Sequence, residues 1–92
     1  EDDKYRNGEE AVRLATELCE ITKFRKPLPL DILAAAYAET KEFDIAILTA
    51  QKGLQLAEQQ GPKELALGLK KRLKLYKKGH PYRQKFINKN ES

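Results

Sequence analysis

A run of small and aromatic residues in the middle of the chain constrains its fold most. Leu33, Ala34 and Tyr37 fall on one helical face, and after a short break alanines recur at the four-residue spacing of Ala46 and Ala50. Small residues let two helix backbones approach closely, and larger side chains fill the space around the contact. The pattern therefore predicts two antiparallel helices packed tightly against each other.

Apolar residues recur at helical spacing on both sides of this pair, and turn signals separate the segments. Asn7-Gly8 indicates a turn with Asn7 as a helix cap, Pro27 and Pro29 stop the first helix, and Gly61 caps the third. The chain has no Trp or Met, and its apolar residues are mostly Leu, Ala and Ile, which suits helices better than a sheet. The expected helices cover residues 9–24, 29–40, 43–60 and 62–78.

The sequence also repeats itself weakly. A shift of 35 residues keeps both the small residues and a helix-starting proline in register, which indicates stacked units of one kind. The superposed pairs are Ala11 with Ala46, Ala15 with Ala50, Cys19 with Leu54, Ile21 with Leu56 and Pro27 with Pro62.

These residues resemble the tetratricopeptide repeat, a helical hairpin that builds protein-binding scaffolds. Ala50 stands where that family usually has an aromatic residue, and Gly53 where it usually has alanine. The matches to the large-small-aromatic signature of the first helix and to the positions around the second are Leu33, Ala34, Tyr37, Phe43, Ala46 and Leu54.

The resemblance implies an all-α fold in which antiparallel helical hairpins stack as a short right-handed solenoid of about four helices. It divides the chain into a tail (1–6), a helical domain (7–78) and a basic tail (79–92). Within the domain we expect half a repeat (7–26), one full repeat (29–60) and a capping helix (62–78). The chain does not begin with Met, so we expect it to be the C-terminal fragment of a repeat array in a longer protein.

Members of this family bind protein partners in a concave groove lined by the first helices of the repeats. The resemblance thus implies a non-catalytic module for protein–protein interaction or assembly, whose partner the sequence does not identify. Ile32, Ala35 and Ala38 have an alternative role, which is packing against neighbouring helices. The expected groove residues are Asp31, Ile32, Ala35, Ala38, Glu39, Leu69 and Arg72.

The first helix lacks the hairpin partner that a complete repeat would provide. Its apolar residues Val12, Leu14 and Leu18 are therefore candidates for partial exposure, and we expect self-association through this face.

Charge is distributed unevenly, and this raises a second hypothesis. Residues 1–64 carry nine Lys/Arg against thirteen Asp/Glu, whereas residues 65–92 carry nine against one, for a net charge of +4. The basic end is either the solvated face of a cap or a site for nucleic acid or anionic membranes, with Tyr76, Tyr82 and Phe86 available for stacking. The candidate basic patch comprises Lys70, Lys71, Lys74, Lys77 and Lys78.

No pattern typical of an enzyme is present. The chain has one His, one Cys, no glycine-rich phosphate loop and no metal-ligand spacing, so we expect no catalysis, cofactor or metal. Cys19 should be a small buried hydrophobe, and His80 a solvated turn residue. A single cysteine forms no internal disulfide, and no apolar run approaches the roughly 20 residues that span a bilayer. The cell compartment is left unassigned.

Overall fold

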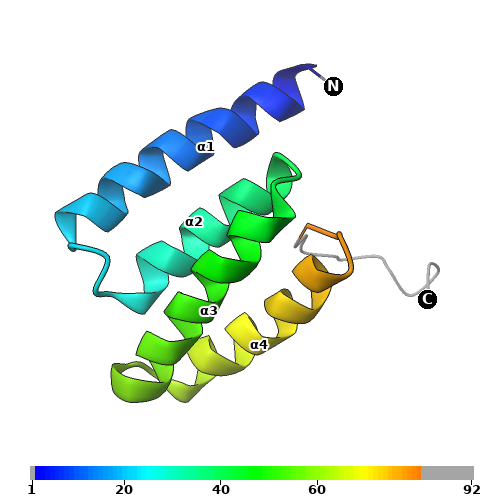
Figure 1. Cartoon of the computed structure of the whole chain (residues 1–92). Coiled ribbons are helices and arrows are strands. Elements are labelled where there is room, and N and C mark those ends of the chain that lie inside the picture. Colours follow the sequence, from blue (N-terminus) through cyan, green and yellow to red (C-terminus); the bar gives the residue numbers. More distant parts are fainter. Residues whose placement is uncertain (1, 82–92) are drawn as a thin grey trace.

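The structure is a computed structural model that describes the backbone of residues 2–81 and the side chains of residues 7–81. This part of the chain forms four helices, α1 (Asp2–Ile21), α2 (Pro27–Glu39), α3 (Phe43–Gln60) and α4 (Lys63–Lys77). The helices follow one another through short connections and pack as adjacent antiparallel pairs (Figure 1). The prediction of an all-α domain with about four helices is thereby confirmed.

α3 lies at the centre of the packing. α2 and α4 both pack along it and also touch each other, so these three helices share one core. α1 packs on the other side of α2, and within the described residues its backbone does not approach those of α3 or α4. The order of the helices in space therefore follows their order in the sequence (Figure 1).

Small side chains make up most of the core. The core has two parts, and Tyr37 packs against both of them and links them. The part between α1 and α2 contains Ala15, Cys19, Leu30 and Leu33. The part shared by α2, α3 and α4 contains Ala34, Ala38, Ala46, Ala50, Ala57, Ala66, Leu69, Leu73 and Tyr76.

Three of the four helices end in the same hydrogen-bonded turn. The residue after each C-cap has a positive φ, at Lys23 (59°), Lys41 (65°) and Gly79 (76°). The following N–H then donates to the carbonyl five residues earlier, which is the Schellman pattern and satisfies a carbonyl that the helix leaves open. These bonds run from Phe24 to Cys19 (2.7 Å), from Glu42 to Tyr37 (2.9 Å) and from His80 to Leu75 (2.9 Å).

The prolines and Gly61 act at the helix boundaries. α2 begins at Pro27, two residues before the expected start, and its first turn holds both Pro27 and Pro29. Proline fits there because its φ is already near the helical value and its missing N–H would have no partner in the helix. Gly61 caps α3 as predicted, and Pro62 is the N-cap residue of α4.

The start of α1 differs from the sequence-based expectation. The helix begins at Asp2, so residues 2–6 continue it and the predicted turn and cap at Asn7-Gly8 are wrong. Gly8 is buried instead, and a Cβ added there would lie 2.9 Å from Cγ2 of Thr40. Its role is to let the first half of α1 approach the end of α2.

Gly53 has a similar role at the contact between α2 and α3. It is buried in the middle of α3, where a glycine normally weakens a helix by about 1 kcal/mol relative to alanine. A Cβ added there would lie 3.3 Å from Cβ of Leu30 and 3.5 Å from the carbonyl oxygen of Pro27. Both atoms belong to or adjoin the backbone of α2, so the helices could not keep their spacing around a larger residue.

The first prediction tests this spacing. Gly53→Leu should lower the free energy of unfolding by about 1–3 kcal/mol, because overpacking forces α2 away from α3. Gln55→Leu is the matched control, since it places the same side chain at an exposed position of the same helix. Urea unfolding followed by circular dichroism measures both variants. Equal stability of Gly53→Leu and the original chain would contradict the proposed close contact.

Candidate functional site

A buried ion pair joins α2 to α4. Arg72 donates from Nε to Oδ1 of Asp31 (2.9 Å) and from Nη2 to Oδ2 (2.6 Å). The side chain of Arg72 is only 17% exposed and that of Asp31 only 12%. Two parallel hydrogen bonds fix both distance and orientation, so the pair sets how α4 sits beside α2.

Gly68 provides the space that this geometry needs. It lies one turn before Arg72, and a Cβ added there would lie 2.8 Å from Nη2 of Arg72. The guanidinium of Arg72 therefore lies against the surface of α4 at Gly68 and reaches from there to Asp31 on α2. Burial raises the pKa of the Asp31 carboxyl above its ordinary value of 3.8, and the hydrogen bonds and charge of Arg72 only partly oppose this effect.

The predicted groove residues fall into three groups. Asp31 and Arg72 meet in the ion pair, while Ala38 and Leu69 are fully buried in the core and offer no surface to a partner. For Ala38, the alternative role of packing against neighbouring helices is thus the observed one. The remaining residues keep exposed surface, namely Ile32, Ala35 and Glu39.

The exposed residues form a stripe along α2, which Leu28 extends by one turn. A hollow of about 550 Å³ lies beside Arg72 on α4, and its other lining residues are Gly68, Lys71, Lys74 and Leu75. The ion pair bridges the two helices between these features. We call the whole the α2–α4 surface, made of Leu28, Ile32, Ala35, Glu39, Gly68, Lys71, Lys74 and Leu75. The sequence placed Lys71 and Lys74 in the basic patch and did not single out Gly68 or Leu75, although a glycine in a helix otherwise rich in Leu and Lys was a signal.

A second apolar surface lies on α1. Leu14 is 51% exposed, Leu18 39% and Ile21 76%. Val12, which the sequence grouped with them, is half-buried and packs against the buried cluster between α1 and α2. Ile21, which was not among the residues expected to be exposed, joins Leu14 and Leu18 at the surface. We call Leu14, Leu18 and Ile21 the α1 face.

The predicted basic patch is exposed throughout. Lys70, Lys71, Lys74, Lys77 and Lys78 all reach solvent along and just after α4. Lys70 Nζ lies 3.7 Å from a carboxylate oxygen of Glu58, and both side chains are more than half exposed. The basic tail from Tyr82 onward lies outside the described residues.

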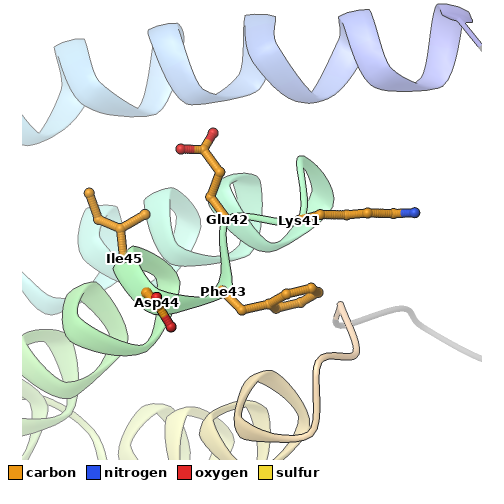
Figure 2. A pocket seen from close by; sticks show the side chains of 5 residues that line it. All are labelled: Lys41, Glu42, Phe43, Asp44 and Ile45. Carbon is orange, nitrogen blue, oxygen red and sulfur yellow. The ribbon is translucent and has the colours of Figure 1, made fainter.

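Further hollows on the described part of the chain were not predicted. The first follows the turn between α2 and α3, where the side chains of Lys41 to Ile45 line about 480 Å³ (Figure 2). Figure 2 shows Glu42 pointing toward α1, whereas Lys41 and Phe43 both extend to the right of the view. Glu42 accepts a hydrogen bond from Oγ1 of Thr40, which holds it to the turn. No group of side chains converges here on one point, so the hollow has no arrangement for chemistry.

The second hollow is apolar and has a volume of about 280 Å³. Its lining residues come from the connection after α1, from α2 and from the first half of α3. Leu48 on its rim is 66% exposed. The lining residues are Phe24, Leu30, Leu33, Tyr37, Ile45, Leu48, Thr49 and Lys52.

The residues with the greatest chemical reactivity have structural roles or stand alone. Cys19 is fully buried, as predicted, and burial, helped by nearby Glu20, raises the pKa of its thiol, which disfavours the reactive thiolate. His80 is exposed in the turn after α4. Between residues 7 and 81, no three His, Cys, Asp or Glu side chains gather in a way that could hold a metal ion. None of the described helices combines the length and apolarity needed to cross a membrane.

Comparison with known proteins adds nothing to this picture. No protein family, curated protein or solved structure gives a significant match to the chain. The exposed surfaces of the fold are therefore what indicates a function for the chain.

The second prediction concerns the ion pair. Arg72→Leu should lower the free energy of unfolding by about 2–3 kcal/mol, because it leaves the Asp31 carboxylate buried without its guanidinium. Asp31→Leu/Arg72→Leu should recover most of this loss, since the buried charge is then absent. Urea unfolding of each variant measures its free energy of unfolding, from which the coupling energy between Asp31 and Arg72 is obtained.

An exposed pair provides the control for this cycle. Lys70→Leu breaks the contact with Glu58 and should cost less than about 0.5 kcal/mol, because solvent screens that pair. A cost for Arg72→Leu no larger than that for Lys70→Leu would show that the Asp31 pair is not structurally important.

The third prediction follows from the raised pKa of Asp31. The folded state holds the Asp31 proton more tightly than the unfolded state, so the contribution of this residue is fully present below pH 3.8 and is lost as pH rises through its folded pKa. The original chain should therefore gain stability relative to Asp31→Asn as the pH is lowered from about 7 to about 3. Denaturant unfolding at several pH values measures the difference. A gain in stability as the pH is raised would instead mean that the charge and hydrogen bonds of Arg72 outweigh burial in setting the pKa of Asp31.

Proposed function

We propose that the chain is a tetratricopeptide-type module for protein–protein interaction, and that the α2–α4 surface binds its partner. In this proposal α1 is the second helix of a preceding repeat, α2 and α3 form one full repeat, and α4 is the capping first helix. The 35-residue shift supports the assignment, because it relates α1 to α3 through Ala11 and Ala46, and through Ala15 and Ala50.

The observation that carries the proposal is the Asp31–Arg72 pair between α2 and α4. Helices two apart in the sequence lie side by side on α3 and are fixed to each other, so they present a continuous surface. Concave surfaces lined by alternate helices are the binding surfaces of stacked helical repeats. A rigid surface also loses less conformational entropy on binding than a mobile one.

The side chains indicate what kind of partner would fit. α2 contributes apolar contact through Leu28, Ile32 and Ala35, whereas α4 contributes positive charge from Lys71 and Lys74 beside the hollow. A complementary ligand would have apolar side chains along one edge and carboxylates along the other. We therefore expect an acidic, amphipathic peptide segment.

The basic patch supports a second candidate function. Five lysines exposed on and just after α4 could also contact phosphates of nucleic acids or anionic lipids. Such binding depends on many phosphate contacts and weakens steeply as salt is added. It needs neither Leu28 nor Ala35, so the two functions can be distinguished by mutation.

The fourth prediction tests the α2–α4 surface. Selection from a displayed peptide library should yield acidic peptides with regularly spaced apolar residues. Lys71→Glu/Lys74→Glu should weaken their binding at least about tenfold, because each substitution replaces attraction by repulsion. Fluorescence anisotropy of labelled peptides measures the affinities, and circular dichroism checks that the variant folds.

The matched control moves the same charge changes elsewhere. Lys52→Glu/Lys63→Glu alters exposed lysines outside the α2–α4 surface and should leave peptide affinity within about twofold. Equal losses of peptide affinity in the two double variants would mean that the overall charge of the chain causes the effect. This result would contradict the proposed site. Salt-sensitive binding of single-stranded or duplex oligonucleotides, or of anionic vesicles, without any peptide selection would favour the second function.

A further inference from the structure

The α1 face has the shape of a helix-docking surface that is left uncovered. Under the 35-residue shift its residues Leu14, Leu18 and Ile21 correspond to Thr49, Gly53 and Leu56 of α3. These α3 positions lie against α2. Gly53 meets Leu30 there, and Leu56 packs on the cluster that contains Leu30 and Leu33. The register therefore places on α1 a surface for a helix that would lie along it as α2 lies along α3.

The neighbouring side of α2 extends this surface. α1 and α2 are antiparallel, with Gly8 of α1 lying against Thr40 at the end of α2. Both helices are right-handed and they run antiparallel. Moving around each helix from its buried side chains, toward Leu18 on α1 and toward Ile32 on α2, therefore leads to the same side of the helix pair. Val12 is half-buried and packs against the buried cluster between α1 and α2. The exposed apolar area thus runs from α1 onto Ile32 and Leu28 of α2.

The charges around the α1 face indicate which helix could cover it. The described part of α1 carries Glu9, Glu10, Glu17 and Glu20 against Arg13 alone, whereas the connection to α2 carries Lys23, Arg25 and Lys26. All of these side chains are exposed. Glu9 and Glu10 therefore make the chain before the α1 face acidic, and the connection after it is basic, with Glu17 and Glu20 between the two.

We propose that a second copy of this chain covers the α1 face, with the two α1 helices antiparallel about a two-fold axis. In this arrangement each copy buries the other's Leu14, Leu18 and Ile21, and Glu9 and Glu10 of each α1 lie opposite the basic connection of the other copy. A two-fold interface must be complementary to itself, and a surface with an apolar centre and oppositely charged ends meets that requirement. A parallel arrangement would instead place acidic side chains against acidic ones.

The α1 face meets the α2–α4 surface at Leu28 and Ile32, whereas its centre and the basic side of that surface lie apart. The α1 face and the Lys71–Lys74 side of the α2–α4 surface lie on different helices that do not approach each other within the described residues. The dimer would therefore leave the basic side of that surface accessible. Loss of one activity by mutation need not affect the other.

The fifth prediction is a concentration-dependent dimer. Sedimentation equilibrium of the chain should show monomer and dimer exchanging between about 1 μM and about 1 mM, as expected for a small apolar interface. Leu18→Glu should weaken dimerisation at least about a hundredfold, because it would place a carboxylate at the centre of the interface. A strict monomer across this range would overturn the proposal and assign the face to another segment or partner.

Leu48→Glu is the matched control for this substitution. It makes the same chemical change at an exposed leucine of α3 and should leave dimerisation unchanged. Both positions are exposed in the described fold, so both variants should fold, which circular dichroism verifies. A dimer that is weakened equally by Leu18→Glu and Leu48→Glu would place the interface elsewhere and overturn the proposal.

A charge exchange tests the antiparallel orientation without changing the apolar residues. Glu9→Lys/Glu10→Lys makes both ends of the interface basic, and Lys23→Glu/Arg25→Glu makes both ends acidic. Each variant alone should dimerise about tenfold more weakly than the original chain, whereas an equimolar mixture should form heterodimers of near-original affinity. A mixture that associates no better than either variant alone would contradict the antiparallel arrangement.

Discussion

The close contact between α2 and α3 is the constraint on which the rest of the structure depends. Gly53 lets Cβ of Leu30 approach α3, and alanines line the remainder of the contact. Because these side chains are small, the two backbones form a single rigid unit. α1 packs on one side of this unit and α4 packs on the other. The larger side chain of Tyr37 then connects the two parts of the core that result.

The Asp31–Arg72 pair fixes the position and rotation of α4 relative to α2 in this packing. Apolar contacts alone allow a helix to slide or rotate by small amounts, whereas a bidentate pair is satisfied in one arrangement only. Its cost is the desolvation of both groups, which is visible in the raised pKa of Asp31. We interpret the pair as a determinant of how α2 and α4 align rather than as a source of net stability. The alignment matters because both helices contribute to the α2–α4 surface.

The sequence predicted the helices well because their signals are local. Prolines, Gly61 and the helical spacing of apolar residues act within a few positions of where they occur, so four helices could be expected from the chain alone. The signals that failed depend on neighbours in space. Gly8 resembles a turn residue until α2 is known to lie against it, and Asp31 resembles a surface carboxylate until Arg72, 41 residues later, is placed beside it.

The same distinction explains the α1 face. Periodicity shows that Leu14, Leu18 and Ile21 belong to an apolar stripe, but it does not show which part of the stripe a neighbouring helix covers. α2 covers only the part that contains Ala15 and Cys19. The uncovered part follows from the packing, because α3 lies between α2 and α4, whereas α1 has α2 as its single neighbour within the described fold. A helix with a single neighbour therefore exposes part of its apolar stripe, and the charges along that edge determine what can cover it.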